Sequence, residues 1–98
     1  MAQIDIQRPH GMSQDAARRR AEDLARRLEK RRGVRWRWEG DELCLDAPSG
    51  PAKGTRGSVR VTAEAVRIRV ELPLLLRPMR PVVESKLHEK LDAMLGKA

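Results

Sequence analysis

The chain has 98 residues and a net charge of +7, from 21 lysines and arginines against 14 acidic residues, and it contains neither phenylalanine nor tyrosine. This length predicts one domain, residues 1–98, with a thin core. A lone cysteine, Cys44, excludes an internal disulfide. The longest apolar run, residues 74–76, is too short to cross a membrane, and the N-terminus shows no apolar signal core. We therefore expect a cytoplasmic protein.

A strand and a helix are the first predicted elements. Residues 3–7 alternate, with Ile4 and Ile6 on one face, which predicts a short strand. Ser13 is a typical helix N-cap, and Gly33 suits the position just after a helix C-terminus. The apolar positions between them have the three-four spacing of one helix face and are Ala17, Ala21, Leu24 and Leu28. We expect this helix to cover the core with small side chains.

The arginine run Arg18–Arg20 on this helix has the composition of a nucleic-acid patch. Acidic residues follow at i,i+4 spacing, as in the pairs Arg18–Glu22 and Arg19–Asp23. We therefore interpret the run as a solvated helix face that neutralises itself.

A hairpin follows the helix, with Gly40–Asp41 as its two-residue turn. The alternation in residues 34–39 places both tryptophans on one face and the arginines on the other, so we expect the tryptophans to point inward. The register then pairs Trp38 with Leu43, Trp36 with Leu45, and Arg35 with Asp46.

The second half of the chain begins with a loop rich in proline and glycine, residues 48–57. A second hairpin pairs residues 59–62 with 65–72, although Ala63–Glu64 is poor chemistry for a two-residue turn and a longer turn is the alternative. A connector bracketed by prolines leads to a last helix that starts near Pro81. The element order is β-α-β-β-β-β-α. This order predicts an α+β fold in which a curved antiparallel sheet of about five strands has two helices on one face.

Catalysis and metal binding both need titratable, nucleophilic or metal-ligating side chains that converge on one site. His10 and His88 lie in different elements, and neither has a cysteine or aspartate at ligand spacing. No activating base accompanies Cys44, and no glycine-rich phosphate loop is present. We expect no enzymatic activity, no metal and no cofactor.

The outer face of the predicted sheet is a candidate anion-binding face. It carries five arginines: Arg35, Arg37, Arg60, Arg67 and Arg69. Because like charges directly opposed destabilise a sheet, an anionic partner such as nucleic acid could compensate them. Salt and neighbouring Glu71 and Asp46 could do so as well, and an arginine-rich composition also follows from GC-rich coding. Inward tryptophans leave this face without a stacking platform for bases.

Leu74, Leu75 and Leu76 form a candidate apolar docking segment between prolines. Three successive side chains cannot all face one core, so we expect at least one to be exposed unless the connector bends sharply. An exposed leucine here suits a granule surface, a membrane interface or a second subunit, and a homodimer or another protein contact is favoured.

Short motifs along almost the whole chain resemble one family. They are Ile4–Asp5–Ile6–Gln7–Arg8–Pro9–His10, Trp36–Arg37–Trp38–Glu39–Gly40–Asp41, Val70–Glu71–Leu72 and Lys90–Leu91–Asp92. This chain is similar to the small polyhydroxyalkanoic acid system proteins, or granule-region proteins, of bacteria that store polyester. The strand and helix order also resembles a shortened helix-grip fold.

The resemblance implies a non-enzymatic accessory or binding protein associated with storage granules, whose partners are the granule surface or granule proteins. An anion- or nucleic-acid-binding module is the alternative. A small hydrophobic-ligand carrier is a further alternative, and it requires an apolar cavity.

Overall fold

A computed structural model describes residues 4–50 and 53–95 of the chain. Its strands are β1 (Ile4–Pro9), β2 (Arg35–Glu39), β3 (Glu42–Asp46), β4 (Arg56–Val61) and β5 (Ala65–Glu71). Its helices are α1 (Gln14–Arg32), the 3-10 helix η1 (Leu74–Met79) and α2 (Arg80–Met94). Gln3, the first residue of the expected N-terminal strand, lies outside the described residues.

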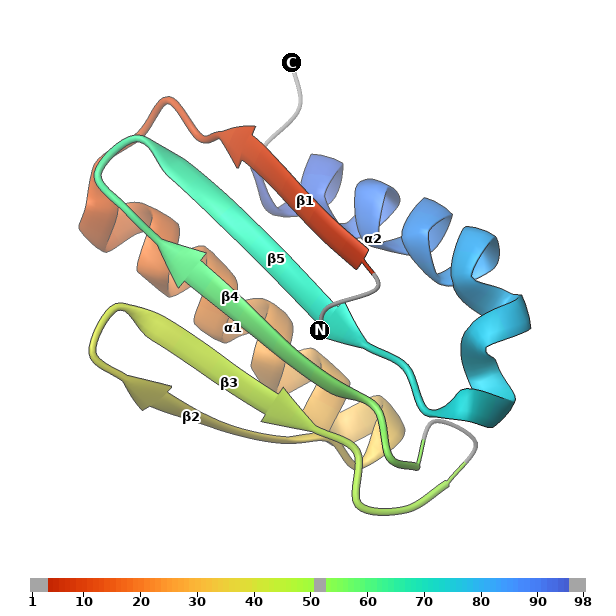
Figure 1. Cartoon of the computed structure of the whole chain (residues 1–98). Helices are drawn as coiled ribbons and strands as arrows, with labels where there is room; N and C mark the ends of the chain where they lie inside the picture. The colour runs from red at the N-terminus through yellow and green to blue at the C-terminus, as the bar shows by residue number, and fades with distance from the viewer. Residues whose placement is uncertain (1–3, 51–52, 96–98) are drawn as a thin grey trace.

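The strands form one open antiparallel sheet in the order β1-β5-β4-β3-β2. Figure 1 shows both long helices on the same side of this sheet, with α1 behind β3 and β4 and α2 behind β1. The predicted α+β class and element order are confirmed. The core lies between the helices and the inner face of the sheet, where Leu43, Val61 and Val66 are fully buried.

Both ends of α1 follow from its sequence. The Ser13 hydroxyl accepts a hydrogen bond from the Ala16 N–H at 3.1 Å, and Gly33 adopts a φ of 68° while its N–H donates to Glu29. The buried face of the helix consists of Ala17, Ala21 and Ala25. Because alanine side chains are small, α1 lies close to the sheet.

The first hairpin has the predicted register, with Trp38 opposite Leu43 and Trp36 opposite Leu45. Both tryptophans face the helix side, but they are half-buried because β2 is an edge strand. Trp38 donates its indole N–H to Glu22 at 2.9 Å, and the Arg18 guanidinium lies 4.2 Å from the centre of its ring. Polar side chains of α1 therefore cover ring surface that the core does not bury.

In the second hairpin one boundary differs from expectation and the expected turn is confirmed. The predicted loop over residues 48–57 extends too far, because β4 begins at Arg56 and Gly57 pairs with Leu45. Ala63–Glu64 does form a two-residue turn. Thr62 closes this turn with hydrogen bonds. Its N–H donates to the Ala65 carbonyl at 2.9 Å, and its hydroxyl accepts from the Ala65 N–H at 2.9 Å.

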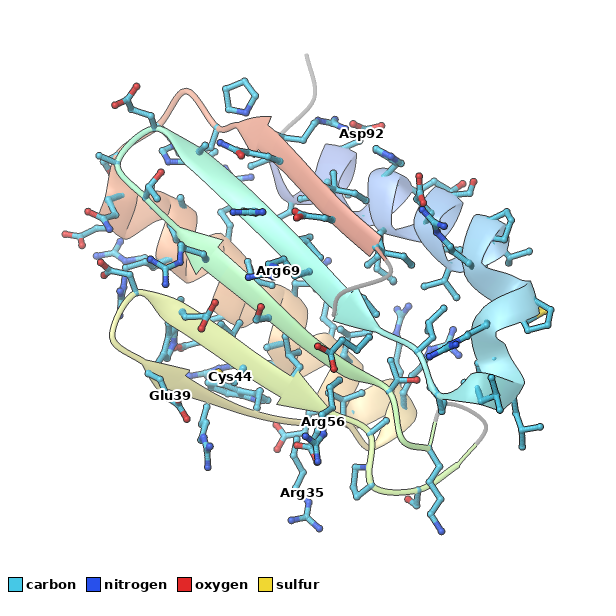
Figure 2. All side chains as sticks on the ribbon, in the orientation of Figure 1. Arg35, Glu39, Cys44, Arg56, Arg69 and Asp92 are labelled. Atoms are coloured by element: carbon cyan, nitrogen blue, oxygen red, sulfur yellow. The ribbon has the colours of Figure 1, made fainter. Side chains whose placement is uncertain are left out.

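The C-terminal half of α2 is held firmly against the rest of the molecule. Leu91 and Met94 are buried, and Arg20 of α1 donates to the Met94 carbonyl at 3.0 Å. Arg8 of β1 forms an ion pair with Asp92, which Figure 2 shows near the end of β1. In the N-terminal half of α2, Val83 and Leu87 are only half-buried, so the two helices enclose less at that end.

Candidate functional site

The outer face of the sheet carries all five arginines that the sequence predicted there. Arg35, Arg37, Arg60, Arg67 and Arg69 lie on β2, β4 and β5 and are exposed. Figure 2 shows Arg69 and Cys44 on this face, the side of the sheet away from the helices. Arg60 lies opposite Arg67, as the predicted register requires.

Carboxylates alternate with these arginines and neutralise most of their charge. Arg67 donates two hydrogen bonds to Asp5, at 2.9 and 2.6 Å, while Arg37 lies 2.6 Å from Glu39. The whole face carries six arginines and five acidic residues. The arginines are Arg35, Arg37, Arg56, Arg60, Arg67 and Arg69, and the acids are Asp5, Glu39, Glu42, Asp46 and Glu71. The face is therefore an ion-pair network that is close to neutral.

Electrostatics at the β1–β5 pair reflect this network. The hydrogen bonds from Arg67 hold the pKa of the Asp5 carboxyl below its usual value, and the nearby charge of Arg69 lowers it further. The Asp5 carboxylate in turn raises the pKa of Arg67. Sequence reasoning did not identify this pair because its partners are 62 residues apart and meet only when β1 adds to β5.

The contacts of His10 and the environment of Cys44 are those of structural residues. His10 is buried, with Nε2 2.9 Å from the Thr62 carbonyl oxygen and Nδ1 accepting from the Met12 N–H. Burial raises the pKa of the Cys44 thiol, and the charges of Glu39 and Glu42 raise it further, which opposes thiolate chemistry. Within residues 4–50 and 53–95, no group of three or more histidine, cysteine or acidic side chains is placed to hold a metal.

The predicted apolar docking segment forms the first half of η1. Leu74 and Leu75 are 73% and 91% exposed, whereas Leu76 packs against the core, so the expectation that at least one leucine stays exposed is confirmed. Met79, at the end of η1, and Val82, in the first turn of α2, are also exposed, at 46% and 47%. We call Leu74, Leu75, Met79 and Val82 the apolar patch. No helix in the described part of the chain is long and apolar enough to span a membrane.

A groove between α1 and α2 is the feature that sequence reasoning missed. It encloses about 570 Å³ and is lined by six basic residues and one acidic residue. The basic residues are Arg20, Arg27, Lys30, Arg31, Arg32 and Lys90, and the acidic residue is Asp23. Helical spacing of positions 20, 24, 27 and 31 was the available signal for the groove.

The expectation that Arg18 pairs along its own helix needs revision, because Arg18 forms an ion pair with Asp41 at 2.9 Å.

Comparison with known proteins identifies a family that matches this chain. The model of the polyhydroxyalkanoic acid system protein family (PHA_gran_rgn) matches residues 4–95. Neither the curated proteins nor the solved structures contain a match. The matched range runs from the first residue of β1 to just beyond α2, so it includes the sheet, the helices and the apolar patch.

Proposed function

Because the chain belongs to the polyhydroxyalkanoic acid system family, we propose that it is a non-enzymatic accessory protein that binds the surface of polyester storage granules. The observation that carries this proposal is the apolar patch on η1 and the first turn of α2. Large apolar side chains exposed together are typical of surfaces that bind a partner.

The chemistry of the patch suits a polyester. Its leucines offer apolar contact to aliphatic polymer, and the exposed guanidinium groups of Arg77 and Arg80 lie beside them in the chain. Guanidinium N–H groups donate hydrogen bonds, and the ester carbonyls of the polymer accept them. Arg77 and Arg80 are both exposed, and Arg80 forms only a long ion pair, 3.8 Å from its Nε to Glu84 Oε1, so both guanidinium groups remain accessible to a partner.

The free energy that Leu74 and Leu75 can contribute indicates reversible binding. Burying Leu74 and Leu75 from their present exposure contributes roughly 2–5 kcal/mol before the cost of association, from about 1.5–3 kcal/mol for each fully buried leucine. A contribution of this size does not by itself exceed the cost of association, so docking is weak and needs the other contacts of the patch and its arginines as well. Because the interaction is mainly apolar, raising the salt concentration should not weaken it.

The test is co-sedimentation of purified protein with purified granules at about 0.05 M and about 0.5 M salt, conditions that change charge screening severalfold. Wild-type protein should sediment equally at both concentrations. Leu75→Glu should lower the partition onto granules about tenfold or more, because it removes most of one leucine contact and adds a charge. Ala63→Glu is the matched control, since Ala63 is exposed in the turn at the other end of β5.

Sedimentation equilibrium of the same proteins tests whether a second copy of the chain covers the apolar patch. If wild-type protein is a dimer and Leu75→Glu is a monomer that still binds granules, the patch is a subunit interface and the granule proposal is wrong.

Nucleic acid binding by the outer face has weaker support, because that face pairs its arginines with carboxylates. Loss of granule binding at the higher salt would favour such a charge-driven role instead.

A further inference from the structure

The two helices leave an apolar hollow between them, above the inner face of the sheet. It has a volume of about 170 Å³. Six half-buried apolar side chains form its walls: Leu24, Leu28, Val34, Leu45, Val83 and Leu87. Its floor consists of buried residues of β3, β4 and β5, including Leu43 and Ile68. Half-buried walls mean that the fold leaves this hollow open to solvent.

The basic groove lies beside this hollow and shares Leu24 and Leu28 with it. Basic residues at the end of a helix commonly stabilise the helix dipole, which accounts for Lys30, Arg31 and Arg32 in the last turn of α1. Arg27 lies before that turn, and Lys90 belongs to the other helix. Their convergence on one groove therefore needs another explanation, and an anionic group provides one.

An unpaired hydroxyl on a residue that lines the hollow is a third observation. Thr55 lines the hollow, and its Oγ1 is buried without a hydrogen-bond partner among the described residues. Buried hydroxyl groups in proteins almost always have a partner, because an unsatisfied one is destabilising. A ligand with a hydroxyl or carbonyl group would provide that partner once the Thr55 side chain turns toward the hollow.

We propose that the hollow between α1 and α2 binds an aliphatic carboxylate, with the alkyl chain between the helices and the carboxylate against the basic groove near Arg27 and Lys90. The volume sets the chain length: an engineered apolar cavity of about 150 Å³ admits benzene, so the hollow of about 170 Å³ accommodates about seven alkyl carbon atoms, as many as octanoate carries beyond its carboxylate. Hydroxyalkanoic acids have this combination of a short chain, a hydroxyl and a carboxylate. The proposal uses no residue of the apolar patch and does not depend on granule docking.

Titration of 15N-labelled protein with sodium octanoate, followed by the amide resonances of Leu28, Thr55 and Val83, tests the site directly. Octanoate should give saturable shifts, and 3-hydroxyoctanoate should bind at least as tightly. Sodium acetate supplies the charge without the chain, and 1-octanol supplies the chain without the charge. Acetate lacks six of the methylene groups that octanoate buries, so it should bind at least about a hundredfold more weakly. 1-Octanol lacks only the charge and should bind about tenfold more weakly.

Matched variants separate a specific site from general attraction to a basic protein. Arg27→Glu should weaken octanoate binding about tenfold through repulsion of the carboxylate. Arg19→Glu makes the same charge change on the same helix, at an exposed position outside the groove, and should change affinity by less than about twofold because solvent screens it. Equal loss in the two variants would overturn the proposal, as would the absence of saturable shifts with wild-type protein.

Filling the hollow provides an independent test. Val83→Trp should abolish octanoate binding while a thermal melt shows a folded protein, and Leu28→Phe serves if the first variant fails to fold. Octanoate binding that survives both replacements contradicts a site in the hollow. Leu75→Glu should bind octanoate normally, so this result and the granule result are distinguishable. Preference for phospholipid vesicles over free octanoate would identify a lipid acyl chain as the source and would refute a site for free acids.

Discussion

Leu91 and Leu87 lie one turn apart on α2 and have different surroundings. Leu91 is 0% exposed and packs in the core, whereas Leu87 is half-buried and lines the hollow. Replacing leucine with alanine removes three carbon atoms, or about 2.4 kcal/mol at about 0.8 kcal/mol per buried methylene. At Leu91 the replacement also creates a cavity, so we expect Leu91→Ala to lower the free energy of unfolding by about 3–4 kcal/mol.

At Leu87 the same replacement should cost about 1 kcal/mol, since the side chain is half-buried and the space beside it already exists. Urea unfolding monitored by far-UV circular dichroism at constant pH measures both values, with each m-value compared to that of wild type. Equal costs at the two positions would refute the reasoning, because they would mean that the helices close over Leu87 in solution. A cost below about 1 kcal/mol at Leu91 would show that α2 is not held by its C-terminal half.

Three further predictions concern stability. Trp38→Ala should lower the free energy of unfolding by about 2 kcal/mol in urea, less than the 3–5 kcal/mol of a fully buried ring, because this ring is half-buried at the sheet edge. Thr55→Val should raise it by about 1 kcal/mol, since it removes a buried hydroxyl that has no partner among the described residues, and a loss of stability would contradict this. Asp5→Asn should reduce stability at pH 6, and the difference from wild type in thermal melts should shrink as the pH falls below the ordinary carboxyl value. The hydrogen bonds from Arg67 lower the pKa of Asp5, so the contribution of Asp5 is present above the ordinary carboxyl value and is lost as the pH falls through the folded value.

Sequence reasoning succeeded where local rules decide the structure. Alternation fixed the facing of Trp36 and Trp38, because a slip of one residue would invert every side chain of the strand. Ser13 and Gly33 marked the ends of α1, since capping depends only on neighbouring backbone groups.

It failed where the outcome depends on distant partners or on absent side chains. Gly57 has no side chain to reveal alternation, so the start of β4 at Arg56 was not visible in the pattern. Arg18 pairs with Asp41, 23 residues away, instead of within its own helix. The basic groove and the hollow required knowledge of how far α2 lies from α1, which no local periodicity encodes.

The distribution of charge decides which side of this molecule meets an anion. The outer face of the sheet pairs six arginines with five carboxylates, whereas α1 alone carries eight basic and four acidic residues. A charge of +7 therefore acts mainly from the helix side, and the apolar hollow opens on that same side. Because long-range attraction orients a protein before short-range contacts form, an approaching carboxylate would be drawn to the helices and not to the sheet. Arginine content on a strand thus predicts an anion site only after the acids of the neighbouring strands are counted.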